Sequence, residues 1–138
     1  MTPSRVLIVA DDRMASSRAI VVLGADSDLV VMTARPHEVQ QLTRSFSPDI
    51  VVMDAASLDL VCNIRLERPK VPVLAVTSNP SVEQAIKALR VGASDYLETF
   101  TDGELRAQVC RLSSSFRADL LSARADAAAP ALIRRSQH

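Results

Sequence analysis

Short apolar runs alternate with longer amphipathic stretches along the chain. The runs are rich in Val, Ile and Leu. Several are continuous rather than alternating in polarity, which is typical of parallel strands that are covered on both faces. We predict five strands, at residues 6–9, 29–32, 50–53, 71–76 and 96–97.

Helical patterns separate these strands. We expect Asp12 to cap a first helix that ends near Gly24, and Pro36 to lie in the first turn of a second helix. A short third helix is predicted over residues 60–66. The second helix carries its apolar residues on one face, at Val39, Leu42 and Phe46.

The last two helices have clear signals at their ends. Gly92 ends a fourth helix, in which four apolar residues follow helical spacing: Val82, Ala85, Ile86 and Leu89. Thr101 and Glu104 form a capping box for a fifth helix, which we expect Pro130 to stop. Its apolar stripe consists of Leu105, Val109, Leu112, Phe116 and Leu120.

This (βα)5 pattern predicts a doubly wound α/β fold, with a five-stranded parallel sheet, right-handed crossovers and helices on both faces. A chain of 138 residues with 48% hydrophobic residues suits one domain with one core. In open α/β sheets the working site lies outside the carboxyl ends of the strands. Polar and acidic residues that directly follow a predicted strand are therefore the candidates for a functional site.

Composition and charge narrow the class of protein. The 16 basic and 16 acidic residues give no formal net charge, which argues against a nucleic-acid-binding protein. No segment approaches the ~18 consecutive apolar residues of a membrane span, and the first apolar run is too short for a signal peptide. We expect a cytoplasmic protein whose Cys62 and Cys110 stay reduced, with Cys110 on the inward side of the fifth helix.

Acidic residues follow the first and third strands. Asp11 and Asp12 come after the first strand, Asp54 after the third and Thr77 after the fourth. Carboxylates that converge repel one another, and a hard divalent cation such as Mg²⁺ removes this conflict. Asp54 stands alone at the tip of a central strand, so it is the candidate nucleophile for an acyl phosphate, with Thr77 donating to a phosphoryl oxygen.

Single strand-end aspartates also have ordinary structural roles. Asp12 is a candidate helix cap as well as a metal ligand, and we interpret Asp49 and Asp59 as cap or loop residues. The set formed by Asp11, Asp12 and Asp54 favours a shared site, because all three occupy matching strand ends in one architecture.

Four segments in this order resemble the response-regulator receiver domain of bacterial two-component signalling. They are RVLIVADDR (5–13), SPDIVVMD (47–54), VPVLAVTS (71–78) and AIKALRVGASDYL (85–97). The last is the most specific, and the resemblance covers roughly residues 5–116. It implies a flavodoxin-like receiver fold with strand order 2-1-3-4-5, and a signalling module rather than an enzyme.

The resemblance also assigns roles to individual positions. They are a Mg²⁺-holding pair at Asp11 and Asp12, a phosphoacceptor and metal ligand at Asp54, a metal-binding backbone carbonyl at Ala56, a switch hydroxyl at Thr77 and a switch aromatic at Tyr96. The partners implied are a histidine kinase or another signalling protein.

Two departures from the family pattern make this an atypical receiver. Thr99 stands where the family has a lysine that contacts the phosphoryl group, and Phe100 replaces the proline that often follows a cis bond. Losing a charge-assisted contact in a buried site costs on the order of 1.5–3 kcal/mol. In addition, Met-Pro and Gly are missing after Asp54, so we expect a trimmed loop or a shortened third helix.

We assign residues 1–122 to the receiver domain and residues 123–138 to a helix extension with a disordered tail, with no room there for an output domain. Two modes of action stay open: phospho-transfer to Asp54, or constitutive binding of a partner. Both use a face made by the fourth helix, fifth strand and fifth helix, which also suits a homodimer. Leu89 and Leu105 lie near this face, although core packing is the favoured interpretation for both.

Enzymes and cofactor-binding proteins on related folds are the alternatives. A Mg²⁺-dependent phosphohydrolase uses a strand-end aspartate, but it needs a second acid two residues later, where this chain has Ala56. A nucleotide- or flavin-binding flavodoxin-like protein needs a phosphate-binding loop, and this chain has three glycines and no Gly-rich loop.

Overall fold

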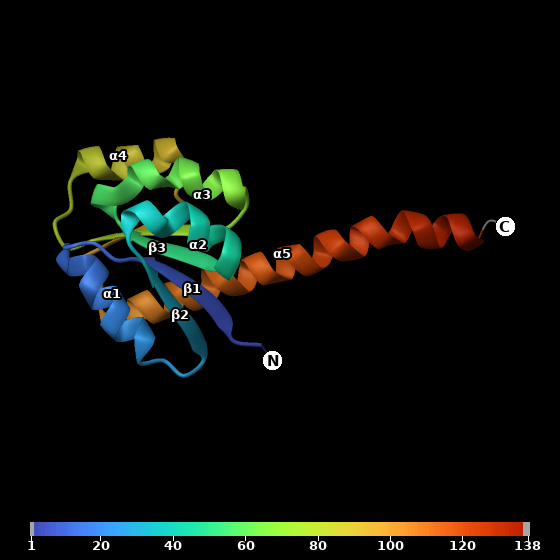
Figure 1. Ribbon diagram of the computed structural model, residues 1–138, viewed down its shortest axis with the longest axis horizontal. Coiled ribbons are helices and arrows are strands. Elements are labelled where there is room, and N and C mark those ends of the chain that lie inside the picture. The colour runs from blue at the N-terminus through green and yellow to red at the C-terminus, as the bar shows by residue number, and fades with distance from the viewer. Residues whose placement is uncertain (1, 137–138) are drawn as a thin grey trace.

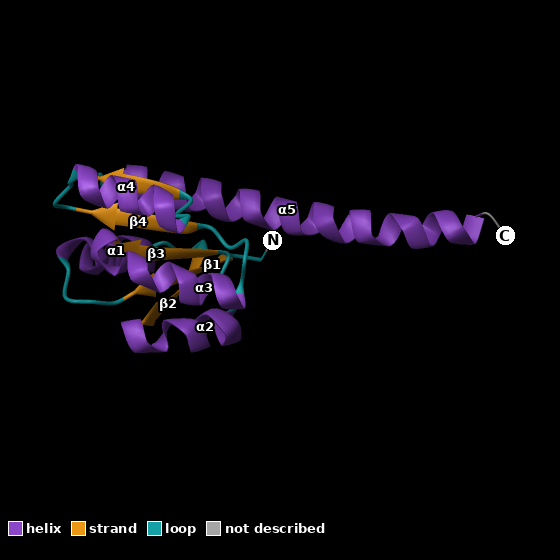
Figure 2. Ribbon diagram, turned by 90° about the horizontal axis from the view of Figure 1, so that it is seen from above, coloured by secondary structure: helices purple, strands orange, loops and turns teal. Residues whose placement is uncertain are grey.

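Five parallel strands form a single sheet in the order β2-β1-β3-β4-β5 (Figures 1 and 2). The computed structural model describes the backbone of residues 2–136 and the side chains of residues 2–125. The strands are β1 (Ser4–Val9), β2 (Leu29–Ala34), β3 (Ile50–Asp54), β4 (Val73–Thr77) and β5 (Asp95–Glu98). The predicted fold class and strand order are therefore confirmed.

Helices cover both faces of the sheet, because successive residues of the central strands point to opposite sides. In β1, Leu7 and Val9 pack into the core beneath α2, α3 and α4, whereas Val6 and Ile8 pack into the core shared with α1 and α5. The helices are α1 (Met14–Gly24), α2 (Val39–Phe46), α3 (Val61–Glu67), α4 (Val82–Val91) and α5 (Asp102–Ser136). Short 3₁₀ turns, η1 (Pro36–Glu38) and η2 (Ala55–Leu60), lead into α2 and α3.

Several predicted helix ends are confirmed. Gly24 is the last residue of α1, and Gly92 ends α4 with φ 86°, a conformation that glycine adopts without steric cost. The Thr101 hydroxyl accepts the Glu104 N–H and donates to its carboxylate, both at 3.1 Å. The short third helix predicted over residues 60–66 is also confirmed, since α3 has seven residues and follows η2 directly.

The predicted cap of the first helix is wrong. Arg13, not Asp12, is the N-cap of α1, and its side chain makes no capping hydrogen bond. The reason lies one residue earlier, because the Asp11 carboxylate already accepts the Arg13 N–H at 2.9 Å. Asp12 is left exposed and available for the strand-end pocket described below.

Two expectations about buried side chains are also wrong. Leu89 was expected in the core but is 79% exposed, and Val82 on the same helix is 75% exposed, because α4 turns Ala88 towards the core instead. Cys110 is exposed, because Leu105 and Val109 take the inward positions of α5. Leu105 itself is fully buried, as core packing requires.

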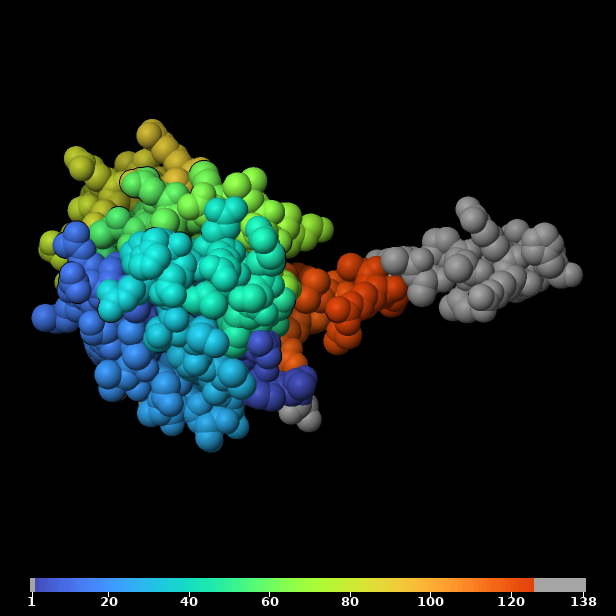
Figure 3. All heavy atoms as spheres, in the orientation of Figure 1, coloured from blue at the N-terminus to red at the C-terminus, as the bar shows by residue number. Residues whose placement is uncertain are grey.

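α5 is much longer than the sheet it covers and projects away from the body of the domain (Figures 1 and 3). The expected stop at Pro130 is wrong, since the helical backbone continues through it to Ser136. Proline removes one hydrogen-bond donor, but the alanines before it are the best helix formers, which favours continuation. Disorder was expected from Pro130 to His138, but the backbone is helical as far as Ser136, and positions 137 and 138 lie outside the described residues. The division at residue 122 stays a prediction.

Among the described residues, no helix has both the length and the apolar character needed to cross a membrane.

Candidate functional site at the strand ends

A polar pocket of about 280 Å³ opens at the carboxyl ends of β3 and β4, beside the start of α1. Parallel strands present their carboxyl ends at one edge of the sheet, which is why side chains distant in sequence meet here. Its lining includes Asp12, Arg13, Asp54, Ala56, Thr77 and Gln84. Four residues predicted from the sequence, at positions 12, 54, 56 and 77, therefore share one pocket.

Asp54 is the last residue of β3 and is only 6% exposed. Its Oδ1 accepts the N–H of Ala56 at 2.8 Å. Burial raises the pKa of the Asp54 carboxyl, and the charge of Asp11 raises it further, while the Ala56 hydrogen bond and the charge of Arg13 act in the opposite direction. The side chain is thus held in place by the backbone and is largely shielded from solvent.

The two consecutive aspartates after β1 play different parts. Asp11 is tied to the protein, since its Oδ1 accepts the Arg13 N–H and its Oδ2 accepts the Ser57 hydroxyl, each at 2.9 Å. Asp12 is exposed and lines the pocket that contains Asp54. Both aspartates also line a neighbouring hollow of about 300 Å³ together with Arg35.

The donor chemistry of this pocket suits a hard divalent cation. Asp12 and Asp54 offer carboxylate oxygens, and Ala56 lines the same pocket. A cation bound here would favour the ionised form of Asp54, and so oppose the burial that raises the pKa of this carboxyl. Among the described residues, however, no three His, Cys, Asp or Glu side chains come together closely enough to form an ion site by themselves.

Thr77, the last residue of β4, is 2% exposed and lines the pocket. Its Oγ1 accepts the backbone N–H of Asn79 at 3.1 Å. That hydrogen bond occupies an oxygen lone pair and orients the side chain, while the hydroxyl proton remains available for donation. The geometry is therefore suited to a hydrogen bond towards an oxygen bound at Asp54.

Tyr96 and Glu98 of β5 lie outside the pocket lining. The Tyr96 hydroxyl oxygen is buried and, within the described residues, has no hydrogen-bond partner. Burial raises the pKa of Tyr96, and the charge of Glu98 adds to this effect. Glu98 is exposed and borders a groove along α4, so it does not add its charge to the Asp54 pocket.

Thr99 lacks the positive charge of a lysine, and it also lies outside the Asp54 pocket. It is exposed, has φ 45° and donates its N–H to the Thr77 carbonyl at 3.1 Å, but it does not line the Asp54 pocket. Phe100 follows it in a trans conformation, since the described residues contain no cis peptide bond. The ring is 3% exposed and is covered by the Arg18 guanidinium, 4.7 Å from its centroid.

Three contributors to this site were missed by sequence reasoning. Ser57 holds Asp11, Gln84 reaches the pocket from α4, and Arg13 lines it from the start of α1. Only Arg13 had a usable signal, because it directly follows the acidic pair in the chain. Ser57 and Gln84 reach the site through the local geometry of η2 and α4, which periodicity does not predict.

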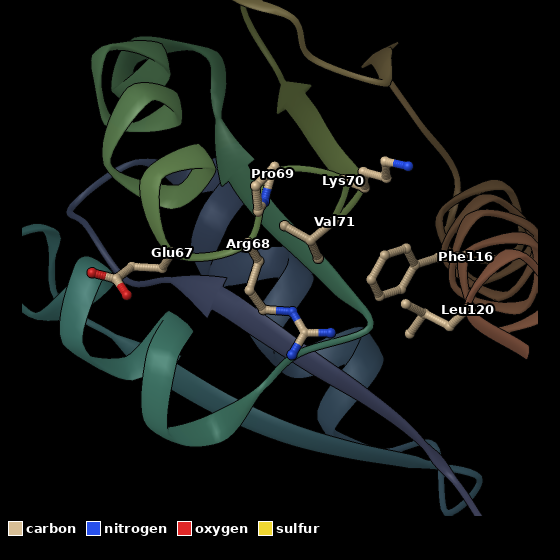
Figure 4. Close-up of a pocket in the computed structure, with 7 residues that line it drawn as sticks. All are labelled: Glu67, Arg68, Pro69, Lys70, Val71, Phe116 and Leu120. Carbon is tan, nitrogen blue, oxygen red and sulfur yellow. The ribbon is translucent and has the colours of Figure 1, made fainter. Parts of the chain in front are cut away.

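A second cavity, of about 380 Å³, lies between the segment before β4 and α5 (Figure 4). Phe116 and Leu120 point from α5 towards Val71, whereas the Glu67 carboxylate points away from them (Figure 4). Glu67 is held by Arg44 at 2.7 Å and by Gln40 at 3.1 Å, which lower its pKa to about 2. The cavity is lined mainly by apolar groups and lies at the start of β4, away from the strand ends that carry the chemistry.

Comparison with known proteins connects this geometry to a family. The family model for the response regulator receiver domain matches residues 6–109, which include every residue of the pocket.

Curated relatives are regulatory proteins longer than this chain. The probable transcriptional regulatory protein TcrX of Mycobacterium tuberculosis is 28% identical over 100 residues, covering 69% of this chain and 43% of that protein. Response regulator MprA of Mycolicibacterium vanbaalenii is 30% identical over 100 residues, with the same coverage. Cell cycle response regulator CtrA of Brucella abortus is 26% identical over 111 residues, covering 76% and 48%. The chain thus spans less than half the length of these relatives.

Solved structures show the same fold. NtrX from Brucella abortus, in complex with ADP, superposes with a TM-score of 0.75 and 22% identity, covering 88% of this chain and 29% of that one. Chemotaxis protein CheY4 of Vibrio cholerae superposes with a TM-score of 0.68 and 24% identity, covering 80% of this chain and 98% of that one.

Proposed function

The chain belongs to the response regulator receiver domain family of two-component systems, and we propose that Asp54 is its phosphoacceptor. One observation carries the proposal: a buried aspartate ends a central strand and opens into a pocket that it shares with Asp12 and Thr77. Burial strengthens the electrostatic interactions of a carboxylate, and the pocket provides a volume in which a phosphoryl group fits beside it.

The chemistry follows from the two oxygens of Asp54. Oδ1 is held by the Ala56 N–H, and within the described side chains no hydrogen bond holds Oδ2. We assign Oδ2 as the nucleophile that attacks the phosphorus of a phosphohistidine on a histidine kinase, or of a small acyl phosphate. Thr77 then donates its hydroxyl proton to a phosphoryl oxygen.

The residues suited to hold Mg²⁺ are Asp11, Asp12, Asp54 and the backbone carbonyl of Ala56. When bound, the ion would offset the negative charge of the phosphoryl group and of the carboxylates. Asp12 and Asp54 face the pocket directly, whereas Asp11 acts from behind them through its contacts with Arg13 and Ser57.

We propose that the output is a protein contact at α4, β5 and the start of α5. Val82, Ile86 and Leu89 are exposed on α4 and form, with Glu98, a groove of about 350 Å³. Tyr96 belongs to the same strand as Glu98, and its hydroxyl oxygen is buried. A second copy of the chain or another signalling protein is the proposed reader of this face.

The exchange of the family lysine for Thr99 makes the receiver atypical. Thr99 provides no charge and sits outside the pocket, so we expect the link between the phosphoryl group and β5 to be weak. A partner that recognises the face constitutively is then the second mode of action, in which phosphorylation adds little to binding.

The test is intact mass spectrometry of the protein after incubation with acetyl phosphate and MgCl2. We expect a single phosphate adduct that is absent from Asp54→Ala and from a sample treated with EDTA. Asp12→Asn serves as the ligand control and should slow formation of the adduct. An adduct that persists in Asp54→Ala, or the absence of any adduct on the unaltered protein, would contradict the assignment of Asp54.

A further inference from the structure

The lining of the Asp54 pocket includes a positively charged side chain, which comes from a different position than the lysine of the family. Among the described side chains that line the pocket, Arg13 is the only one with a positive charge. It enters from the start of α1, on the side of Asp12, whereas Thr99 follows β5 and stays outside the lining.

The backbone fixes where Arg13 stands. As N-cap of α1 it has φ −82° and ψ 143°, and its N–H is held by the Asp11 carboxylate. Its Cα is therefore anchored beside the acidic pair by the same aspartate that supports the pocket. Such an anchor lowers the entropy lost when the side chain orders around a bound group.

The guanidinium of Arg13 is not committed elsewhere. Within the described residues it takes part in no ion pair and no side-chain hydrogen bond, and the side chain is exposed at the pocket rim. Other arginines are engaged: Arg18 pairs with Asp102, Arg44 with Glu67 and Arg111 with Asp95.

We infer that Arg13 supplies the positive charge that Thr99 lacks, by binding the phosphoryl oxygens on Asp54 from the α1 side. This inference rests on the proposed function of Asp54. When Oδ2 attacks acetyl phosphate, its bond to phosphorus forms as the bond between phosphorus and the acetate oxygen breaks, and acetate leaves with the electron pair. The phosphoryl group remains with its negative charge, and a guanidinium can meet two of its oxygens through paired N–H donors.

The position of this charge has a mechanistic consequence. A lysine after β5 would tie the phosphoryl group to the strand that carries Tyr96, whereas Arg13 ties it to α1. Arg13 therefore acts as a positioning residue for the phosphoryl group, without pulling on β5.

The test compares Arg13→Met with Arg13→Lys and with Arg35→Met, a control that removes one arginine charge beside the acidic pair but outside the Asp54 pocket. Two quantities are measured: the rate of adduct formation with acetyl phosphate and Mg²⁺, and the Kd of beryllofluoride, a phosphoryl mimic. We expect Arg13→Met to weaken both about tenfold or more, Arg13→Lys to restore most of the loss and Arg35→Met to change them less than twofold. Thermal unfolding midpoints should be alike for all four proteins.

A rescue variant separates a charge effect from a structural one. Adding Thr99→Lys to Arg13→Met restores a cation at the family's position, so the rate and the beryllofluoride Kd should recover. If Arg13→Met behaves like Arg35→Met while the unaltered protein forms its adduct, this inference is overturned and the role of Asp54 stands. If the unaltered protein forms no adduct and does not bind beryllofluoride, the role of Arg13 and the phosphoacceptor role of Asp54 are both refuted.

Discussion

The ends of β3 and β5 lie at the same edge of one sheet, yet they differ in what they present. The end of β3 presents Asp54, buried and hydrogen-bonded to Ala56, in a pocket with acidic and hydroxyl groups. The end of β5 presents an exposed Thr99 with φ 45° and a buried Phe100 fixed under Arg18. The end of β3 thus carries the groups that we propose to accept a phosphoryl group, while the end of β5 is fixed by a buried aromatic ring.

The largest expected effect is at that anchor. Phe100→Ala removes a ring that is 3% exposed in the core between α1 and α5 and should lower the free energy of unfolding by about 3–5 kcal/mol. Urea denaturation followed by circular dichroism measures this. Leu89→Ala, at a position 79% exposed, is the matched control and should change stability by less than about 0.5 kcal/mol. Equal losses in the two variants would show that Phe100 does not anchor this junction.

The next effect concerns Asp54 at the end of β3, which should make the free energy of unfolding depend on pH. Because the folded-state pKa of Asp54 is raised, ionisation destabilises the fold, and stability falls as the pH rises from the ordinary Asp pKa through the raised one. Asp54→Asn cannot ionise, so it should be more stable than the unaltered protein at pH 7. The gain should shrink as the pH falls through the raised pKa, and it should be lost below the ordinary Asp pKa. Urea midpoints measured from pH 3 to pH 8 without Mg²⁺ test this, and a pH-independent gain would refute it.

A smaller effect is expected from the cover of Phe100. Arg18 lies over the ring and also pairs with Asp102 at 3.1 Å, with both side chains about half exposed. Arg18→Met removes both interactions and should cost about 1 kcal/mol, most of it from the cation–π contact. The loss should be halved or less when Phe100 is already Ala, and a double-mutant cycle measures this coupling. Strict additivity would mean that Arg18 does not act through the ring.

The smallest effect concerns Thr99 itself. A β-branched residue with φ 45° is strained, whereas glycine is not, although glycine also loses more chain entropy on folding. Thr99→Gly should therefore stabilise the protein by a few tenths of a kcal/mol, up to about 1 kcal/mol. Differential scanning calorimetry would detect the raised melting temperature. A clear loss of stability would indicate that the Thr99 side chain makes a contact that matters more than its backbone strain.

Much of the fold follows from local signals in the sequence. Five apolar runs predict the five strands. Gly24, Gly92 and the Thr101–Glu104 capping box mark the ends of helices, where backbone groups lack partners within the helix. The strand-end aspartates and Thr77 were predicted to meet, and positions 12, 54 and 77 share one pocket. These signals suffice because strand order brings the same ends to the same edge.

Other features depend on tertiary packing that periodicity does not encode. Helical spacing in α4 indicates an apolar stripe but not its direction, and small Ala88 faces the core while Leu89 faces outward. The start of α1 depends on which aspartate accepts the Arg13 N–H, a choice between neighbours with identical side chains. Helix continuation through Pro130 likewise depends on the alanines around it.

The length of α5 has a geometric consequence. At about 1.5 Å per residue, its 35 residues make a rod of roughly 50 Å, only the first part of which rests on the sheet. The rod begins at Asp102, two residues after Phe100, where Arg18 of α1 pairs with Asp102 and covers the Phe100 ring. A change of one degree in the direction of a rod of this length displaces its far end by about 1 Å, so a small reorientation of α5 on the sheet becomes a larger displacement far from the domain.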